Sequence, residues 1–402
     1  MGYKKSAAIT NAIIALESAF SFNCTRFTLN HLTAQDNQPV PFVKINTGVA
    51  DAIPVLFTGG VHARELAPPD ALLSFCRQLL SAFTNGTDIT YPAFTDSSGV
   101  VYDEYAVPLS TVNDIFSRID LYVVPCVNPD GRDFALSGST SVERMWRKNR
   151  RPGSPCQGAD INRNFPIAWD QDVYYSAAAA TTVHTSKDPC SEVFRGYTLA
   201  PPPNGPAIEP ETMNLMELVA QTGITHLVDV HMFGRTILYP WGIEQNQSFD
   251  QTQSFLNPLF NFQRDGVVSG TTYAEYIPDN LVDARGPLLS RHQSLAASMA
   301  AAIVASAGSG ATAIQRSTYT PQPSCMLYPT TGAFDDFTFS RQFADPLLLN
   351  VHTFTLEAGQ ELGGNPSDPE DDDGGFWPDS ANQYPKVERE IHAALFGLLS
   401  AI

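Results

Sequence analysis

The segment Thr58–Leu66, TGGVHAREL, places a histidine and a glutamate three residues apart, directly after an apolar run. Both side chains bind zinc, and a catalytic zinc site needs three protein ligands with an open position for water. Two histidines and one glutamate form a known set of this kind. A single His-x-x-Glu pair also occurs by chance, so His62 and Glu65 are a metal-site hypothesis that depends on a third ligand.

His231 is the best candidate for the third ligand. It ends the apolar segment LVDVH, where alternation along a strand places residues 227, 229 and 231 on one face and His226 on the other. The remaining histidines have neither a carboxylate nor another histidine at ligand spacing, and ordinary packed or surface side chains are expected there: His31, His184, His292, His352 and His392.

Apolar segments adjoin these residues and indicate the elements that must position them. Buried strands are predicted at 54–60, 118–127, 225–231 and 351–359, with a turn at Asn128–Gly131 after the second. Helices are predicted at 66–83, 209–223, 291–306 and 384–402. This alternation predicts an α/β fold with a mixed, largely parallel twisted sheet covered by helices on both faces. Residues distant in sequence are then expected to converge at the carboxyl ends of the strands.

The whole chain is predicted to be a single domain, residues 1–402, because no linker or internal repeat divides it. A net charge of −18 repels polyanions and argues against a nucleic-acid partner. No apolar run approaches the ~18–20 residues that span a bilayer, so no membrane partner is expected. The first 20 residues resemble a helix more than a signal peptide.

The cysteines and one acidic segment leave questions open. No CxxC pair occurs, and Cys76 and Cys126 lie in apolar contexts typical of buried free thiols. The pairing of Cys24 and Cys325 stays open. The acidic segment 365–375 lacks EF-hand spacing, so a solvated loop is expected, with a calcium site as the alternative.

Seven motifs in a fixed order resemble those of a known enzyme family. They are GGVHARE, VNPDG, MWRKNR, GADINRNF, VDVHMFGRTILYPWG, YPTTGAFDDF and FTLEAG. Together they are similar to the motifs of zinc metallocarboxypeptidases of the pancreatic carboxypeptidase A/B type. The resemblance implies a carboxypeptidase-like fold and one Zn²⁺ ion held by His62, Glu65 and His231.

The resemblance also implies roles for residues outside the metal set. Glu357 of FTLE is the expected general base, and Arg147 is expected to stabilise the oxyanion. The remaining residues bind substrate or support the site: Arg64 lines the subsites, Asn162 and Arg163 grip the terminal carboxylate, Tyr328 closes over it, and Asp160 orients His62.

The specificity of such an enzyme depends on the floor of its side-chain pocket. In the family this position lies seven residues after the closing tyrosine, which is Asp335 here. An acid there implies a preference for C-terminal Lys or Arg. If Asp335 instead turns outward or pairs with an internal arginine, the pocket would take apolar or aromatic ends and be lined by Leu238, Leu327, Thr330 and Ala333.

A disulfide between Cys156 and Cys190 is implied by the same resemblance. It favours an oxidising compartment and hence secretion, with an intracellular location as the alternative because no signal peptide is visible.

The expected function is removal of one C-terminal residue from peptides or proteins by a monomeric zinc exopeptidase. Two alternatives remain: a cell-wall peptide or amide hydrolase on the same scaffold, and a non-catalytic binding protein. The latter would have lost a ligand or the base, whereas this chain retains them all.

Overall fold

A computed structural model describes residues 2–96, 98–197, 208–267, 273–278, 282–283, 286–345, 348, 350–359, 375–378 and 383–402. Its central feature is an eight-stranded sheet in the order β1-β2-β8-β3-β9-β16-β10-β15. The strands are β1 Cys24–Thr28, β2 Pro41–Ile45, β3 Ile53–Gly59, β8 Ile119–Val124, β9 His226–Met232, β10 Thr236–Tyr239, β15 Thr320–Pro323 and β16 His352–Ala358. The central run β8-β3-β9-β16 is parallel, and antiparallel pairs join it to β2 and β10.

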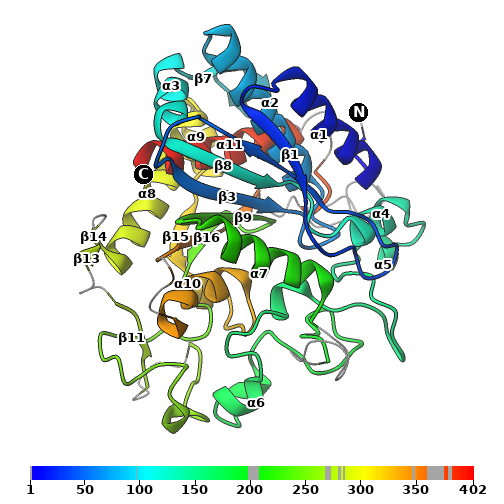
Figure 1. Cartoon of the computed structure of the whole chain (residues 1–402), viewed down its shortest axis with the longest axis vertical. Helices are drawn as coiled ribbons and strands as arrows, with labels where there is room; N and C mark the ends of the chain where they lie inside the picture. Colours follow the sequence, from blue (N-terminus) through cyan, green and yellow to red (C-terminus); the bar gives the residue numbers. More distant parts are fainter. Residues whose placement is uncertain are drawn as a thin grey trace.

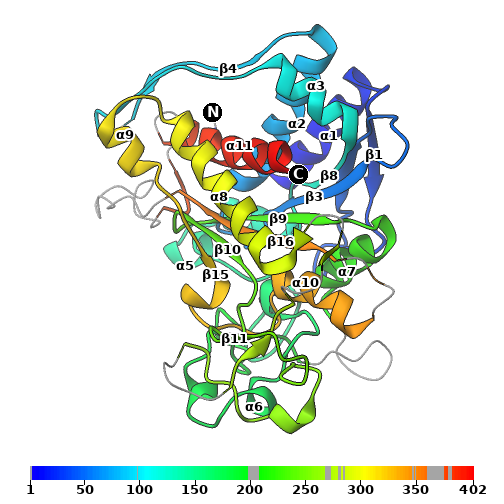
Figure 2. The ribbon, with the colours of Figure 1, turned by 90° about the vertical axis from the view of Figure 1, so that its left-hand side faces the viewer.

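Helices cover both faces of this sheet, as the sequence predicted. Figures 1 and 2 show α1, α2 and α11 on one side of the central strands, with α7 and α10 on the other. The helices are α1 Ser6–Ala19, α2 Ala67–Asn85, α3 Leu109–Arg118, α4 Pro129–Ser137, α5 Ser141–Arg144, α6 Gln171–Tyr174, α7 Pro210–Thr222, α8 Leu288–Ser306, α9 Ala311–Arg316, α10 Phe334–Ala344 and α11 Tyr384–Ala401.

Small two-stranded sheets lie in the connections around the main sheet. They are β4 Ile89–Tyr91 with β7 Tyr105–Val107, β5 Phe94–Thr95 with β6 Val101–Tyr102, β11 Gln247–Ser248 with β12 Glu275–Tyr276, and β13 Val282–Asp283 with β14 Gly286–Pro287.

The strand register places the polar residues near the carboxyl ends of the central strands on one face of the sheet. Phe57, Val228 and Leu356 belong to the core under α2, α8 and α11. In the parallel register Thr58 pairs with Asp229, and Glu357 pairs with His231. Because side chains alternate along a strand, these polar residues all project from the opposite face. Polar chemistry is therefore concentrated on the α7/α10 side, near the carboxyl ends of β3, β9 and β16.

One predicted turn is in fact the start of a helix. Asn128–Gly131 was expected to be a turn, but Pro129 is the first residue of α4, and the Asn128 side chain caps it by accepting a 2.9 Å hydrogen bond from the Gly131 N–H. Asn and Pro are common both in turns and at helix starts, since Asn caps helices and Pro suits their first turn. The other predicted helices and strands match the observed ones within a few residues.

Two further features considered in the sequence are a membrane-spanning helix and the acidic segment. None of the described helices is both long and apolar enough to cross a membrane. The acidic segment 365–375, considered as a calcium site, lies outside the described residues except for Gly375.

Candidate active site

His62, Glu65 and His231 converge although they are widely separated in sequence. His62 Nδ1 lies 2.6 Å from Glu65 Oε1, and His231 Nδ1 lies 3.0 Å from both His62 Nδ1 and Glu65 Oε2. All three side chains are buried. His231 comes from the end of β9, whereas His62 and Glu65 come from the loop between β3 and α2. They are the one group of metal-binding side chains found among the described residues.

This donor set fits a zinc ion. Zinc bonds of about 2.0–2.1 Å in tetrahedral geometry separate neighbouring ligand atoms by about 3.3 Å. The distances of 2.6–3.0 Å between the donors are a few tenths shorter, a gap that small side-chain rotations would close. Each histidine also presents Nδ1 to the other donors while Nε2 faces a carboxylate. This leaves both Nδ1 lone pairs available to a metal.

Asp160 supports His62 from behind. It lies immediately before a short 3-10 helix, Ile161–Arg163, and its Oδ1 is 3.2 Å from His62 Nε2. Its Oδ2 accepts a 2.9 Å hydrogen bond from Arg147 Nε. Burial opposes ionisation, but the charges of Arg147 and His62 hold the pKa of the Asp160 carboxyl well below its usual range. The predicted role of Asp160 in orienting His62 therefore has a matching geometry.

Arg147 carries a donor that nothing else in the described structure uses. Its Nε is fixed by Asp160, but its Nη2 is buried without a hydrogen-bond partner. A buried unpaired donor is costly, and such groups occur where a ligand supplies the missing acceptor. Arg147 can therefore donate to an oxygen atom in this site.

Glu357 lies beside the metal-binding set. Glu357 lies on β16, where it pairs in register with His231 of the neighbouring strand β9, and it is 9% exposed. Burial raises the pKa of its carboxyl to about 7, against the opposing charge of His231. A carboxylate with a pKa near neutrality can both accept and return a proton.

Arg163 and Tyr328, which are predicted to bind a terminal carboxylate, lie next to each other, and Asn162 is hydrogen-bonded to Arg163. Arg163 donates from Nε to the His184 carbonyl and from Nη1 to the Asn162 carbonyl. Its guanidinium carbon lies 5.8 Å from the Tyr328 ring centroid. The Asn162 Oδ1 accepts from the Phe334 N–H, which leaves its amide NH₂ for a ligand.

Arg64 and Asp335, the other two residues predicted to bind substrate, have separate sets of contacts. Arg64 stacks on Phe376, with 4.4 Å to the ring centroid, and donates to Glu192 Oε2 at 3.2 Å. Asp335, in the first turn of α10, is buried and accepts hydrogen bonds from Ser324 Oγ at 2.7 Å and from the Asp336 N–H at 2.9 Å. Burial raises the pKa of Asp335. In the described part of the chain no Lys, Arg or His forms an ion pair with it.

Two residues near the site were not predicted from the sequence. His184 was assigned an ordinary role, yet its ring centroid lies 4.2 Å from that of Tyr328, and burial together with Arg163 lowers its pKa to about 4. Asp229 was not singled out, yet its Oδ2 lies 2.6 Å from His231 Nε2. The alternation in LVDVH, which places 229 and 231 on one face, was the signal that could have identified Asp229. No comparable signal marked His184.

The cysteines include the disulfide that the resemblance implied, and Cys24 and Cys325, whose pairing was open, are free thiols. Cys156 and Cys190 form a disulfide across 34 residues of sequence. The other four thiols are buried and unpaired: Cys24, Cys76, Cys126 and Cys325.

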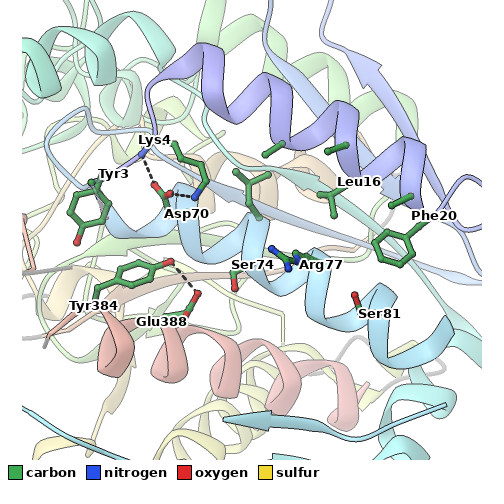
Figure 3. Close-up of a pocket in the computed structure, with 15 residues that line it drawn as sticks. Tyr3, Lys4, Leu16, Phe20, Asp70, Ser74, Arg77, Ser81, Tyr384 and Glu388 are labelled. Carbon is green, nitrogen blue, oxygen red and sulfur yellow. Dashed lines mark hydrogen bonds and ion pairs between the residues drawn. The ribbon is translucent and has the colours of Figure 1, made fainter. Parts of the chain in front are cut away.

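A separate groove of about 710 Å³ lies between α1, α2 and α11 (Figure 3). Lys4 pairs with Asp70 at one end, and Tyr384 donates to Glu388 along one wall. None of the residues that line it belongs to the converging set described above. The groove is therefore distinct from the converging set, and the buried donor set decides the location of the site.

Comparison with known proteins agrees with this arrangement. The sequence profile described as "Zinc carboxypeptidase" matches residues 25–390. Metallocarboxypeptidase A of Trichophyton rubrum is 30% identical over 190 residues, covering 47% of this chain and 35% of that protein. Carboxypeptidase B of Astacus astacus is 27% identical over 212 residues, covering 52% of this chain and 54% of that protein. The chain thus spans about a third to a half of the length of these relatives.

Solved structures share the fold across almost the whole chain. Bovine thrombin-activatable fibrinolysis inhibitor, solved with tick carboxypeptidase inhibitor, gives a TM-score of 0.63 at 18% identity and covers 99% of this chain and 97% of that one. Carboxypeptidase A of Helicoverpa armigera gives 0.65 at 18% identity, covering 99% and 73%. These likenesses establish the α/β carboxypeptidase fold. With the profile matching most of its length, the chain belongs to the zinc carboxypeptidase family.

Proposed function

We propose that this chain is a zinc-dependent exopeptidase that removes one residue from the C-terminus of peptides. The observation that carries the proposal is the buried convergence of His62, Glu65 and His231 beside Glu357. Family membership supports the same reading. A non-catalytic protein would not need the ligand set, the base and the unpaired Arg147 donor together.

The proton-handling step falls to Glu357. A zinc ion held by the three ligands would polarise the scissile carbonyl and lower the pKa of a water molecule. Burial raises the pKa of Glu357 to about 7, so Glu357 is suited to take a proton from an attacking water and to give it to the leaving amine.

Arg147 and the Asn162–Arg163 pair are suited to bind two different negative groups of the substrate. The free Nη2 of Arg147 is available to the oxygen on which charge develops. The Asn162 amide and the Arg163 guanidinium, with Tyr328 beside them, are suited to a carboxylate. Together they would select a free C-terminus and position its peptide bond next to Glu357.

We further propose a preference for C-terminal Lys or Arg. Asp335 is 3% exposed, so it does not turn outward, and no cation in the described structure neutralises it. A buried carboxylate is stabilised by a cationic partner, which a basic substrate side chain would supply. The apolar alternative, a pocket of Leu238, Leu327, Thr330 and Ala333, remains the competing expectation.

The disulfide bears on the cellular setting. The Cys156–Cys190 disulfide supports an oxidising compartment and therefore secretion. The substrates would be peptide or protein C-termini met by a monomeric enzyme.

The test is to measure initial rates on two blocked dipeptides that differ only in ending with Lys or Phe, with and without a zinc chelator. Faster release of Lys that the chelator abolishes is expected, and Asp335→Asn should reverse the preference. Asp51→Asn is the control, because Asp51 is exposed near the start of β3, at the end of the strand away from His62.

Other results would discriminate the remaining possibilities. Faster release of Phe by the unmodified protein would retain the exopeptidase and refute the basic preference. Turnover of neither dipeptide by the zinc-loaded protein would refute the exopeptidase and favour a cell-wall peptide or amide substrate.

A further inference from the structure

Asp229 is a fully buried carboxylate placed directly behind a metal-binding histidine. Its Oδ2 accepts a hydrogen bond from His231 Nε2 at 2.6 Å, and its Oδ1 accepts one from Thr58 Oγ1, also at 2.6 Å. The residue is 0% exposed. Both oxygens are thus engaged within the chain, so Asp229 is not arranged to bind substrate.

The two metal-binding histidines are supported unequally. His62 Nε2 lies 3.2 Å from Asp160 Oδ1, and Asp160 also accepts a hydrogen bond from Arg147. The Asp160 charge is therefore shared between an imidazole and a guanidinium. Asp229 has a shorter contact and, among the described residues, no Lys or Arg ion partner. Among the described residues, His231 is the one group with which Asp229 forms an ion pair.

The sheet fixes Asp229 in this position. In the parallel register it lies between Thr58 on β3 and Thr355 on β16. Asp229 and His231 are two residues apart on one strand, so they project from the same face. The Thr58 hydroxyl restrains the second oxygen. Rotation of the carboxylate away from His231 would cost the Thr58 bond as well.

We propose that Asp229 is a positioning residue that holds His231 in the tautomer with the proton on Nε2 and the lone pair on Nδ1. The Nδ1 atom is the one that faces His62 and Glu65. A carboxylate on the outer nitrogen fixes the orientation of the ring and raises the basicity of the inner one. Asp229 thereby strengthens metal binding at one specific ligand. This inference rests on the proposed metal set.

The first experiment measures zinc affinity of the metal-free protein by competition with a chromophoric chelator, without any activity assay. Asp229→Asn and Asp229→Ser are expected to weaken zinc binding by about 10–100-fold, the usual effect of losing such a partner. Thr355→Val is the matched control, because Thr355 is buried on the same face beside Asp229 without a hydrogen bond to it. Its affinity should stay within about twofold of the unmodified protein.

A second measurement follows the proton itself. Proton NMR of the zinc-loaded protein with ¹⁵N-labelled histidine should show a downfield, slowly exchanging Nε2 proton on His231. Because zinc on Nδ1 leaves a proton on Nε2 in any case, its downfield shift and slow exchange are the readout, and both should be reduced in Asp229→Ser.

The outcomes separate the two proposals. If the unmodified protein binds zinc but both Asp229 variants bind it equally well, or the Nε2 proton keeps the same shift and exchange rate in Asp229→Ser, the role of Asp229 is refuted and the metal site stands. If the unmodified protein does not bind zinc, the metal site itself is refuted, and the role of Asp229 with it.

Discussion

At the residue scale, the site is defined by groups that are left partly unsatisfied. Arg147 has one nitrogen fixed by Asp160 and another buried without an acceptor. Leaving a buried donor unpaired costs about 1–3 kcal/mol in the free protein. A substrate oxygen would relieve that cost, most strongly when it carries negative charge.

Replacing Arg147 should therefore affect the chemical step more than binding. We expect Arg147→Gln to lower kcat by about 10²–10³-fold, with KM changed much less, because the lost donor acts where charge develops. Steady-state kinetics on the preferred dipeptide would measure this, with zinc content checked for each protein. Arg26→Gln, which removes an exposed arginine on β1, should leave both constants unchanged. A rise in KM at constant kcat would instead indicate that Arg147 binds the ground state.

The sequence identified some of these residues better than others. His62 and Glu65 are three residues apart, a spacing that also occurs by chance, and the ordered series of motifs made a metal-binding role for the pair the better interpretation. Asp229 and His184 belong to no such spacing. Their roles depend on which face a strand presents and on how the segment after Asn162–Arg163 folds back against Tyr328, and both are tertiary properties. The unpaired nitrogen of Arg147 was likewise invisible in the sequence.

At the element scale, α8 and β16 meet through a buried histidine. His292 on α8 donates from Nδ1 to the Leu288 carbonyl at 2.8 Å, and its Nε2 accepts from the Thr353 N–H at 3.2 Å. Its Nδ1 also lies 3.3 Å from Nδ1 of His352. Both ring nitrogens are thus used by the neutral form. Burial lowers the pKa of His292 to about 4.

This arrangement predicts a loss of stability in acid. A histidine with a folded pKa near 4 and an unfolded pKa near 6.5 stabilises the protein above pH 6.5, and this contribution is lost as the pH falls towards 4. The expected loss is on the order of 1–3 kcal/mol. Urea unfolding at several pH values should show a shallower decline for His292→Gln than for the unmodified protein. His31→Gln, at a half-buried histidine paired with Glu217, should keep the full decline, and equal slopes for all three would contradict the prediction.

Elements were the most predictable level of the structure. The strands that carry His231 and Glu357 are buried along their whole length, as expected for strands covered on both faces. Helix α7 ends where Gly223 adopts φ 62°, a conformation that glycine reaches without strain. The start of α4 was mistaken for a turn because its capping residues carry the same composition as a turn.

At the scale of the whole molecule, the sheet carries the metal-binding and proton-handling groups, and one long connection carries the groups for the substrate carboxylate. Asn162, Arg163 and His184 all lie between Cys156 and Cys190, the ends of the disulfide. His62, Glu65, His231 and Glu357 lie outside it. The disulfide thus closes a loop around the groups proposed to bind the substrate carboxylate, together with Asp160, to which Arg147 donates a hydrogen bond; Tyr328 and Asp335 lie outside this loop.

Reduction of this disulfide should therefore separate the two activities of the site. Closing a loop of 34 residues restricts the unfolded chain by about 3–4 kcal/mol on the loop-entropy account. Mild reduction, or a Cys156→Ser/Cys190→Ser double variant, is expected to raise KM several-fold while zinc affinity changes less than threefold. Cys76→Ser is the control for a thiol outside the loop. Equal loss of zinc and substrate binding would contradict this separation.

The disulfide also implies an order of maturation. A newly made chain could acquire its metal while still in a reducing environment, because none of the three ligands lies within the loop that the crosslink closes. Its affinity for substrate would reach the full value only once the crosslink forms. The timing of thiol oxidation, rather than of metal loading, would then set when the chain holds its substrates at full strength.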